Sequence, residues 1–424
     1  MSTHYSSFHS VVRCAVVTAL AFAGLPGRAA DGLNQPVAVP PHTWAMPATA
    51  LVSARAQLAR GDSRREIPLV QLRAEADALL PLKPASVMDK TETAASGDRH
   101  DYFSFAPYWW PDPAKPDGLP YVRDDGKTNP ESKKGTDSAA LARTCRAVQT
   151  LGLAYWFTGE ERYAEKAATL TRVWFLDPAT RMTPNLEHAQ AIPGINHGRG
   201  IGIIEARHLI DLNDGLALIA ASPAWKDADS AAMRTWLTDY YHWLTTSKNG
   251  HEEAHAEGAY AGNNHGSWYD AQAADLALVL GHMDEARKIL TAVAHERIAR
   301  QIDPDGRQPL ELARTKSLNY SLFNLEALVL LARFGEHVGV DLWNFSTPDG
   351  RSLRVALRYV APYADPAKAW LKEDMEPADR ARILPLLVEG IRHSDEAALR
   401  DPLAKFLGAP RPGEHWRLWS NELR

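Results

Sequence analysis

The strongest constraint on the fold is a helical spacing of apolar residues that recurs along most of the chain. From Ser138 onward, Ala, Leu and Val repeat at intervals of three and four residues, and short polar breaks separate the runs. No long alternating pattern of a β-strand accompanies them. The sequence therefore predicts an all-α fold of helical hairpins, either a toroid or a solenoid. The predicted helices span residues 69–80, 138–157, 162–175, 201–221, 228–246, 268–280, 283–300, 318–338, 353–364 and 380–392.

The N-terminus is typical of a secretory signal peptide. Basic and polar residues lead into an apolar run at residues 14–25, and small residues follow at 27–30. We expect cleavage near residue 30, export to the periplasm or the medium, and no membrane span afterwards. Cys14 lies in this segment, so Cys145 is left without an intramolecular disulfide partner and is expected to be a buried thiol. The net charge of −5 argues against a nucleic-acid partner.

Three segments interrupt the helical pattern and concentrate polar or aromatic groups: residues 98–135, 185–200 and 248–266. The third contains Asn264 and His265 just before a predicted helix, with Ser267 as its expected N-cap. Helix N-termini carry partial positive charge and unpaired N–H groups, so amide and imidazole donors there favour an anion such as a carboxylate. A polar capping loop without ligand is the alternative.

Arg314 and Tyr320 lie at the start of the helix predicted over residues 318–338. On one continuous helix, a six-residue separation would place them about 240° apart. They can meet only if Arg314 lies in the entering loop or the helix starts near Ser317. A neighbouring cation would have to lower the tyrosine pKa, ordinarily about 10, for the phenol to act as a base. An unrelated core tyrosine and surface arginine are the alternative.

Two further groups are candidates for substrate binding. Asn196, His197 and Arg199 stand among glycines that let a ligand approach the backbone closely. The proline-rich segment at residues 98–135 carries aromatic side chains suited to stacking on sugar rings or to plugging one end of a helical ring; those singled out for binding are Tyr108, Trp109 and Trp110.

A zinc-protease motif also has to be weighed. Residues 251–255 read His-Glu-Glu-Ala-His, which fits the H-E-x-x-H pattern that zincins carry on a helix. Asn249 and Gly250 immediately before the motif argue against a helix here. We therefore expect no metal and no cofactor.

Four of these stretches, in this order, resemble the alginate lyase superfamily and are similar to polysaccharide lyase family 38. The stretches are YFSFAPYWWPDPAKPDGLPYVRDDGKTNPE, LAYWFTGEERYAEKAATLTRVWFLDPATRM, NNHGSWYD and ELARTKSLNYS. The resemblance implies an (α/α) toroid or incomplete barrel, occupying residues 31–424 as one domain with its motifs within 102–335. It also implies β-elimination on an acidic polysaccharide or oligosaccharide, such as alginate or glucuronan.

Under this resemblance the catalytic residues are Asn264, His265, Arg314 and Tyr320. Asn264, Arg314 and His197 are candidates to neutralise the substrate carboxylate, because the proton on C5 is too weakly acidic while the carboxylate keeps its full charge. Tyr320 is either both base and acid, or the acid opposite His265 as the base.

Two other function classes remain open from the residues. A glycoside hydrolase on a similar toroid would need two carboxylates facing one cleft. The available candidates are Glu187, Glu205, Glu252, Glu257 and Glu311. A non-catalytic sugar-binding protein of the cell envelope would use the same aromatic side chains but would not need Tyr320 close to Arg314.

Overall fold

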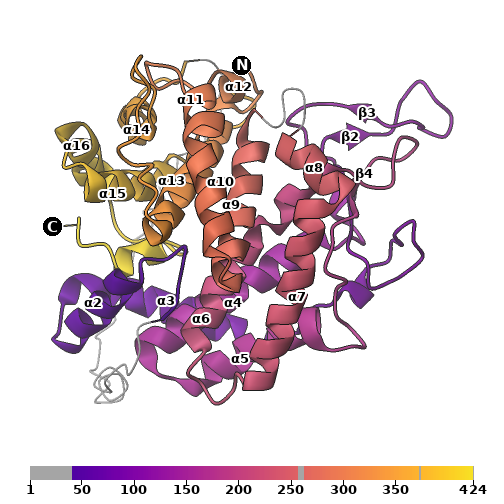
Figure 1. Ribbon diagram of the computed structural model, residues 1–424, viewed down its shortest axis with the longest axis horizontal. Coiled ribbons are helices and arrows are strands. Elements are labelled where there is room, and N and C mark those ends of the chain that lie inside the picture. The colour runs from indigo at the N-terminus through magenta and orange to yellow at the C-terminus, as the bar shows by residue number, and fades with distance from the viewer. Residues whose placement is uncertain (1–40, 256–261, 372–373, 424) are drawn as a thin grey trace, which may run out of the picture.

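The computed structural model describes residues 41–255, 262–371 and 374–423, and these are predominantly helical. Figure 1 shows long helices stacked side by side, with the short strands gathered at one edge. This confirms the all-α prediction. The predicted signal segment at residues 1–30 and the candidate Glu257 lie outside the described residues. No helix within the described ranges is both long enough and apolar enough to span a bilayer.

The first half of the chain forms a group of helices around α4. The helix α4 packs against α3, α5 and α6, and α7 packs against the later helix α9. The bounds are α2 (Ala48–Ala59), α3 (Glu66–Leu79), α4 (Ser138–Thr158), α5 (Glu161–Thr171), α6 (Leu209–Ile219), α7 (Asp227–Thr246) and α8 (Lys248–His255). The sequence missed α2, and the helix expected over residues 201–221 is divided into the 3₁₀ helix η5 (Gly200–His208) and α6.

The second half is arranged around the pair α9 and α13, with α10 packed against both. The bounds are α9 (Asn264–Leu280), α10 (Met283–Val293), α11 (Ala299–Gln301), α12 (Pro309–Leu312), α13 (Ser317–Val338), α14 (Leu353–Val360), α15 (Ile383–His393) and α16 (Ala397–Phe406). The C-terminal helices join the same core as α13, and the chain then returns to α3, where Arg65 donates to the Leu418 carbonyl over 2.8 Å.

The helix α9 belongs to two hydrophobic cores at once. Tyr269, Ala273 and Leu276 lie in the core of the first half, while Trp268 and Ala271 lie in that of the second. Nearly every side chain of α9 is buried as a result. A helix held from all sides in this way has little freedom to move, so groups at its N-terminus are placed firmly.

The strands form two small pairs near the helix ends. The strand β1 (Phe103–Phe105) runs parallel to β4 (His188–Ala191). The strand β2 (Trp109–Trp110) pairs antiparallel with β3 (Val122–Arg123), with Trp109 opposite Arg123. The long segment predicted as a loop over residues 98–135 therefore contains β1 and the β2–β3 hairpin, and Figure 1 shows β2, β3 and β4 at one edge of the molecule.

Candidate active site

The four residues predicted to be catalytic meet in one cavity of about 290 Å³. Helices α9 and α13, the 3₁₀ helix η5 and the β2–β3 hairpin all contribute to its wall. The lining residues are Pro107, Tyr108, Trp109, Arg123, Gln190, Arg199, Ile201, Ile204, Glu205, Arg207, Asn264, His265, Arg314, Tyr320 and Phe323. Tyr320 and His265 thus share one cavity, although they are 55 residues apart in the sequence.

The N-terminus of α9 begins earlier than the sequence predicted. Asn263, not Ser267, is the N-cap, and its Oδ1 accepts a hydrogen bond from the His265 amide over 3.0 Å. Ser267 is buried inside the helix and donates to Gln301. Asn264 and His265 are therefore the first residues of the helix, where unpaired N–H groups and the helix dipole favour an anion.

His265 is oriented by a buried carboxylate. Glu253 of α8 is 1% exposed, and its Oε1 lies 2.8 Å from the Nδ1 of His265. Since an ionised carboxylate only accepts, Nδ1 carries the proton and donates it to Glu253. The second ring nitrogen, Nε2, is then left with a lone pair. This arrangement suits an imidazole that takes a proton and is stabilised as imidazolium.

Asn264 is bound to a second buried carboxylate. Its backbone N and side-chain Nδ2 donate to the two oxygens of Glu311, at 2.6 and 2.8 Å. Burial raises the pKa of Glu311, although the hydrogen bonds from Asn264 oppose that rise. The pair fixes the start of α9 against α12, which carries Glu311. The amide of Asn264 is thereby held in one orientation.

Arg314 and Tyr320 meet in the way that the helical geometry requires. The helix α13 begins at Ser317, where Asp374 accepts from the amides of Ser317 and Leu318 at 2.8 and 2.9 Å. Arg314 lies in the preceding turn, and its guanidinium carbon is 3.8 Å from the centre of the Tyr320 ring. Asp125 accepts two hydrogen bonds from the same guanidinium, at 3.0 and 3.2 Å.

The pKa of the Tyr320 phenol is not lowered, as a role as base would require. Burial, followed by the neighbouring Tyr108, raises its pKa well above the ordinary value, and the charge of Arg314 only partly opposes this. The hydroxyl oxygens of Tyr108 and Tyr320 are 2.8 Å apart and share a hydrogen bond. At neutral pH Tyr320 therefore keeps its proton, which suits a proton donor.

The predicted substrate-binding residues divide into two groups. Tyr108, Trp109 and Arg199 line the cavity, and Arg199 donates to the Gln190 side chain over 2.8 Å. Asn196, His197 and Trp110 do not line it. The Asn196 side chain accepts from the Ile192 amide, His197 is exposed, and the indole of Trp110 donates to the Lys127 carbonyl.

Two arginines that line the cavity were missed by reading the sequence: Arg207 of η5, and Arg123, which enters from β3. Glu205 of η5, considered only as a carboxylate of a hydrolase, also lines it. Glu205 accepts from Tyr102 and Ser104 at 2.7 and 2.6 Å, and burial raises its pKa. The sequence did carry one signal for the residues of η5. Charged residues interrupt the apolar pattern within residues 201–221, the range predicted as one helix.

The H-E-x-x-H segment is helical after all, because Ser247 caps α8 by accepting from the Gly250 amide over 3.0 Å. Its second glutamate, Glu253, is used to hold His265. Within the described ranges, no group of three or more His, Cys, Asp or Glu side chains is arranged to hold a metal ion.

Cys145 is free and buried, as expected, and burial raises its pKa.

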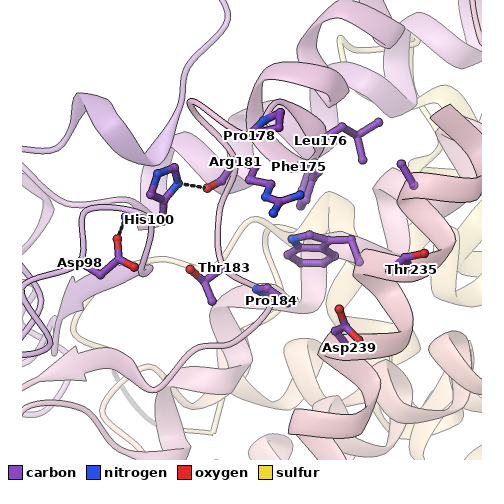
Figure 2. A pocket seen from close by; sticks show the side chains of 12 residues that line it. Asp98, His100, Phe175, Leu176, Pro178, Arg181, Thr183, Pro184, Thr235 and Asp239 are labelled. Atoms are coloured by element: carbon purple, nitrogen blue, oxygen red, sulfur yellow. Dashed lines mark hydrogen bonds between the residues drawn. The ribbon is translucent and has the colours of Figure 1, made fainter. Parts of the chain in front are cut away.

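A second cavity, of about 450 Å³, differs in chemistry (Figure 2). Trp236, Arg181 and two aspartates line it, and Figure 2 shows Asp98 and Asp239 on opposite sides of the cavity. The Nδ1 of His100 bonds to the Arg181 carbonyl over 2.7 Å. Two exposed carboxylates facing this cavity make it less suited to a polyanion than the arginine-lined cavity.

Known proteins resemble this chain in sequence and in fold. The profile of the alginate lyase family matches residues 86–370. The crystal structure of an alginate lyase from Bacteroides ovatus is 37% identical, with a TM-score of 0.83, and the match covers 90% of this chain and 100% of that one. No curated protein gave a significant match. The likeness in fold to alginate lyase structures confirms the predicted helical toroid.

More distant matches are to alginate lyase A1-III from a Sphingomonas species. Its structure is 16% identical, with a TM-score of 0.46, and covers 77% of this chain and 88% of that one. A variant of the same enzyme, complexed with a tetrasaccharide, is 15% identical, with a TM-score of 0.48 and the same coverage.

Proposed function

Because this chain belongs to the alginate lyase family and is a polysaccharide lyase, we propose that it cleaves alginate by β-elimination in the arginine-lined cavity. The observation that carries the proposal is the convergence there of an imidazole held by a buried carboxylate and a buried, protonated phenol. An acidic polysaccharide fits a cavity to which four arginines contribute.

In the proposed reaction His265 is the base and Tyr320 is the acid. The Nε2 of His265 takes the proton from C5, and the electron pair forms the C4–C5 double bond as the C4–O4 bond breaks. Tyr320 donates its proton to O4 of the departing chain, and solvent then moves the proton from His265 to the phenolate. One chain gains a new end and the other an unsaturated uronate, so all atoms balance.

This division of roles makes a prediction about stereochemistry. When the base and the acid are separate groups, sugars whose C5 proton and O4 lie on opposite ring faces are the better substrates. Guluronate has this arrangement, whereas mannuronate and glucuronate carry both on the same face. We therefore expect polyguluronate to be cleaved faster than polymannuronate, and glucuronan to be a poorer substrate.

The test is a screen of polyguluronate, polymannuronate, glucuronan and glycosaminoglycans for new ultraviolet absorbance near about 235 nm, the signature of an unsaturated uronate. The proposal is supported if absorbance rises fastest with polyguluronate. New reducing ends without absorbance would indicate hydrolysis instead. Among the described members of the proposed carboxylate set, only Glu205 lines the cavity, which favours elimination over hydrolysis.

A further inference from the structure

Arg207 lines the same cavity as the two proposed proton-transfer residues, His265 and Tyr320. Its guanidinium carbon lies 5.3 Å from the ring centre of Phe323 and 6.0 Å from that of Trp268. Those two rings are 5.1 Å apart, and the Trp268 indole donates to the Phe323 carbonyl over 3.1 Å. The aromatic pair therefore forms a rigid support for the cation.

The position of this support along the helices is informative. Trp268 follows His265 by three residues on α9, and Phe323 follows Tyr320 by three residues on α13. Three residues of α-helix rise by about 4.5 Å. The guanidinium of Arg207 thus lies beside side chains that are about one helical turn further along α9 and α13 than the imidazole and the phenol.

Among the described residues, Arg207 forms no ion pair. One side-chain nitrogen donates to the Ile204 carbonyl over 2.9 Å. Throughout the described part of the chain, no carboxylate lies within ion-pairing distance of this guanidinium. Glu205, Asp211 and Glu326 act on it only through longer-range electrostatics, and burial lowers its pKa. A buried cation without an ion pair is costly, so such groups usually have a partner or a ligand.

Two of the other arginines that line the cavity differ in this respect. Arg314 and Arg123 both bind Asp125, with Nη2 to Oδ1 distances of 3.0 and 2.7 Å. Their charges are therefore partly balanced before any substrate arrives. Arg207 offers the cavity a positive charge that no described side chain neutralises at close range.

We propose that Arg207 binds the carboxylate of the uronate that is being cleaved and neutralises it as the C5 proton leaves. This rests on the proposed function of the cavity. A sugar whose C5 lies between His265 and Tyr320 can direct its carboxylate toward Arg207, which lines the same cavity. The reach from C5 through a carboxylate oxygen to a guanidinium nitrogen is about 5 Å, similar to the offset along the helices. Negative charge accumulates on that carboxylate in the transition state, so Arg207 acts on turnover as well as binding.

The test compares Arg207→Met and Arg207→Lys with Arg146→Met. Arg146 approaches the next residue of η5, with its Nη2 3.4 Å from the Nε2 of His208, but does not line the cavity. We expect Arg207→Met to lower kcat on polyguluronate by about 10²- to 10³-fold. Arg207→Lys should recover part of that loss, and Arg146→Met should remain within about twofold of wild type.

A second measurement separates charge neutralisation from support of the fold. Each protein is assayed on oligoguluronate and on its methyl ester, whose carboxyl group carries no charge. The rate ratio between free acid and ester should fall at least tenfold in Arg207→Met, which a purely structural defect would not cause. An unchanged ratio, or a wild-type kcat in Arg207→Met, would overturn the proposal. Failure of the wild type to form unsaturated product from any uronan would instead overturn the proposed function.

Discussion

The two walls of the cavity are built in different ways. The helical wall carries His265 and Tyr320 on the first turns of α9 and α13, and a capping side chain fixes the start of each helix. The hairpin wall carries Tyr108 and Asp125 on a segment with only two paired positions between β2 and β3. In the proposed reaction, proton transfer belongs to the helical wall, and the hairpin wall modulates it through two contacts.

The hairpin wall makes its two contacts with Tyr320 and with Arg314. The Tyr108 hydroxyl bonds to Tyr320 over 2.8 Å, and Asp125 binds Arg314 in two places. Loss of a group on the helical wall should therefore remove turnover, whereas loss of a contact with the hairpin should reduce it. The expected effects form a graded series that can be measured.

The largest effect is expected for Tyr320→Phe, which removes the proposed acid from the helical wall. Turnover should fall by about 10³-fold or more, because the proposed proton donor to O4 is lost. Oligouronate binding, measured by calorimetry, should remain close to wild type. The control is Tyr240→Phe, which removes a fully buried hydroxyl remote from the cavity. Tyr320→Phe with wild-type turnover would contradict the assigned role.

The next effect is expected for Glu253→Gln. Neutral glutamine no longer stabilises the imidazolium, so kcat should fall by about 10²-fold and the acidic limb of the kcat–pH profile should shift. A purely structural role would leave the position of that limb unchanged. The matched control is Glu252→Gln, an exposed neighbour on α8 that pairs with Lys248 at 3.6 Å. Equal effects in both variants would show that the pairing with His265 is not responsible.

A smaller effect is expected from displacing the hairpin wall with Gly126→Ala. A Cβ at Gly126, where φ is +82°, would collide with the hydroxyl of Thr315 in the turn before α13. We expect kcat/KM to fall by about tenfold, since the hairpin must move away from Arg314. Gly350→Ala is the control, because φ there is +92° but nothing lies within 4 Å. Similar losses in both would assign the effect to backbone strain alone.

The smallest effect concerns the stability supplied by Asp125. Burial would raise its pKa, but the hydrogen bonds and charges of Arg314 and Arg123 outweigh this and lower it. Its contribution is therefore present above the unfolded pKa of about 3.9 and is lost as the pH falls through the folded value. Asp125→Asn should lower Tm by about 1–3 °C at pH 7, and this loss should shrink as the pH falls below about 3.9. Asp124→Asn, at a neighbouring carboxylate that pairs with Lys127, is the control; a Tm difference that stays constant as the pH falls would exclude the ion pair as its cause.

Much of the helical wall could be predicted from the sequence, because its residues follow helical geometry. The six-residue separation of Arg314 and Tyr320 already required the helix to start near Ser317, and it does. The role of Glu253 could not be predicted, since it depends on α8 lying against α9. Arg207 was hidden for a similar reason: its partners Trp268 and Phe323 come from two later helices.

The hairpin wall was less predictable. Its aromatic residues indicated a folded segment, but which of them face the cavity depends on register. Trp109 and Trp110 are adjacent in a strand, so their side chains point to opposite faces and only one can enter the cavity. The N-cap of α9 was predicted at Ser267 instead of Asn263. The sequence offered several polar residues there, and asparagine and serine are about equally good N-caps.

The burial of α9 in both cores has a consequence for engineering this protein. A change of volume at Ala271 or Ala273 would shift the helix along its axis, and the imidazole at its end would move with it. Selection for thermostability by repacking either half would therefore also alter the alignment of the reacting groups. Libraries that vary the interior should be screened for turnover from the first round, because heat resistance and catalytic rate share one structural element.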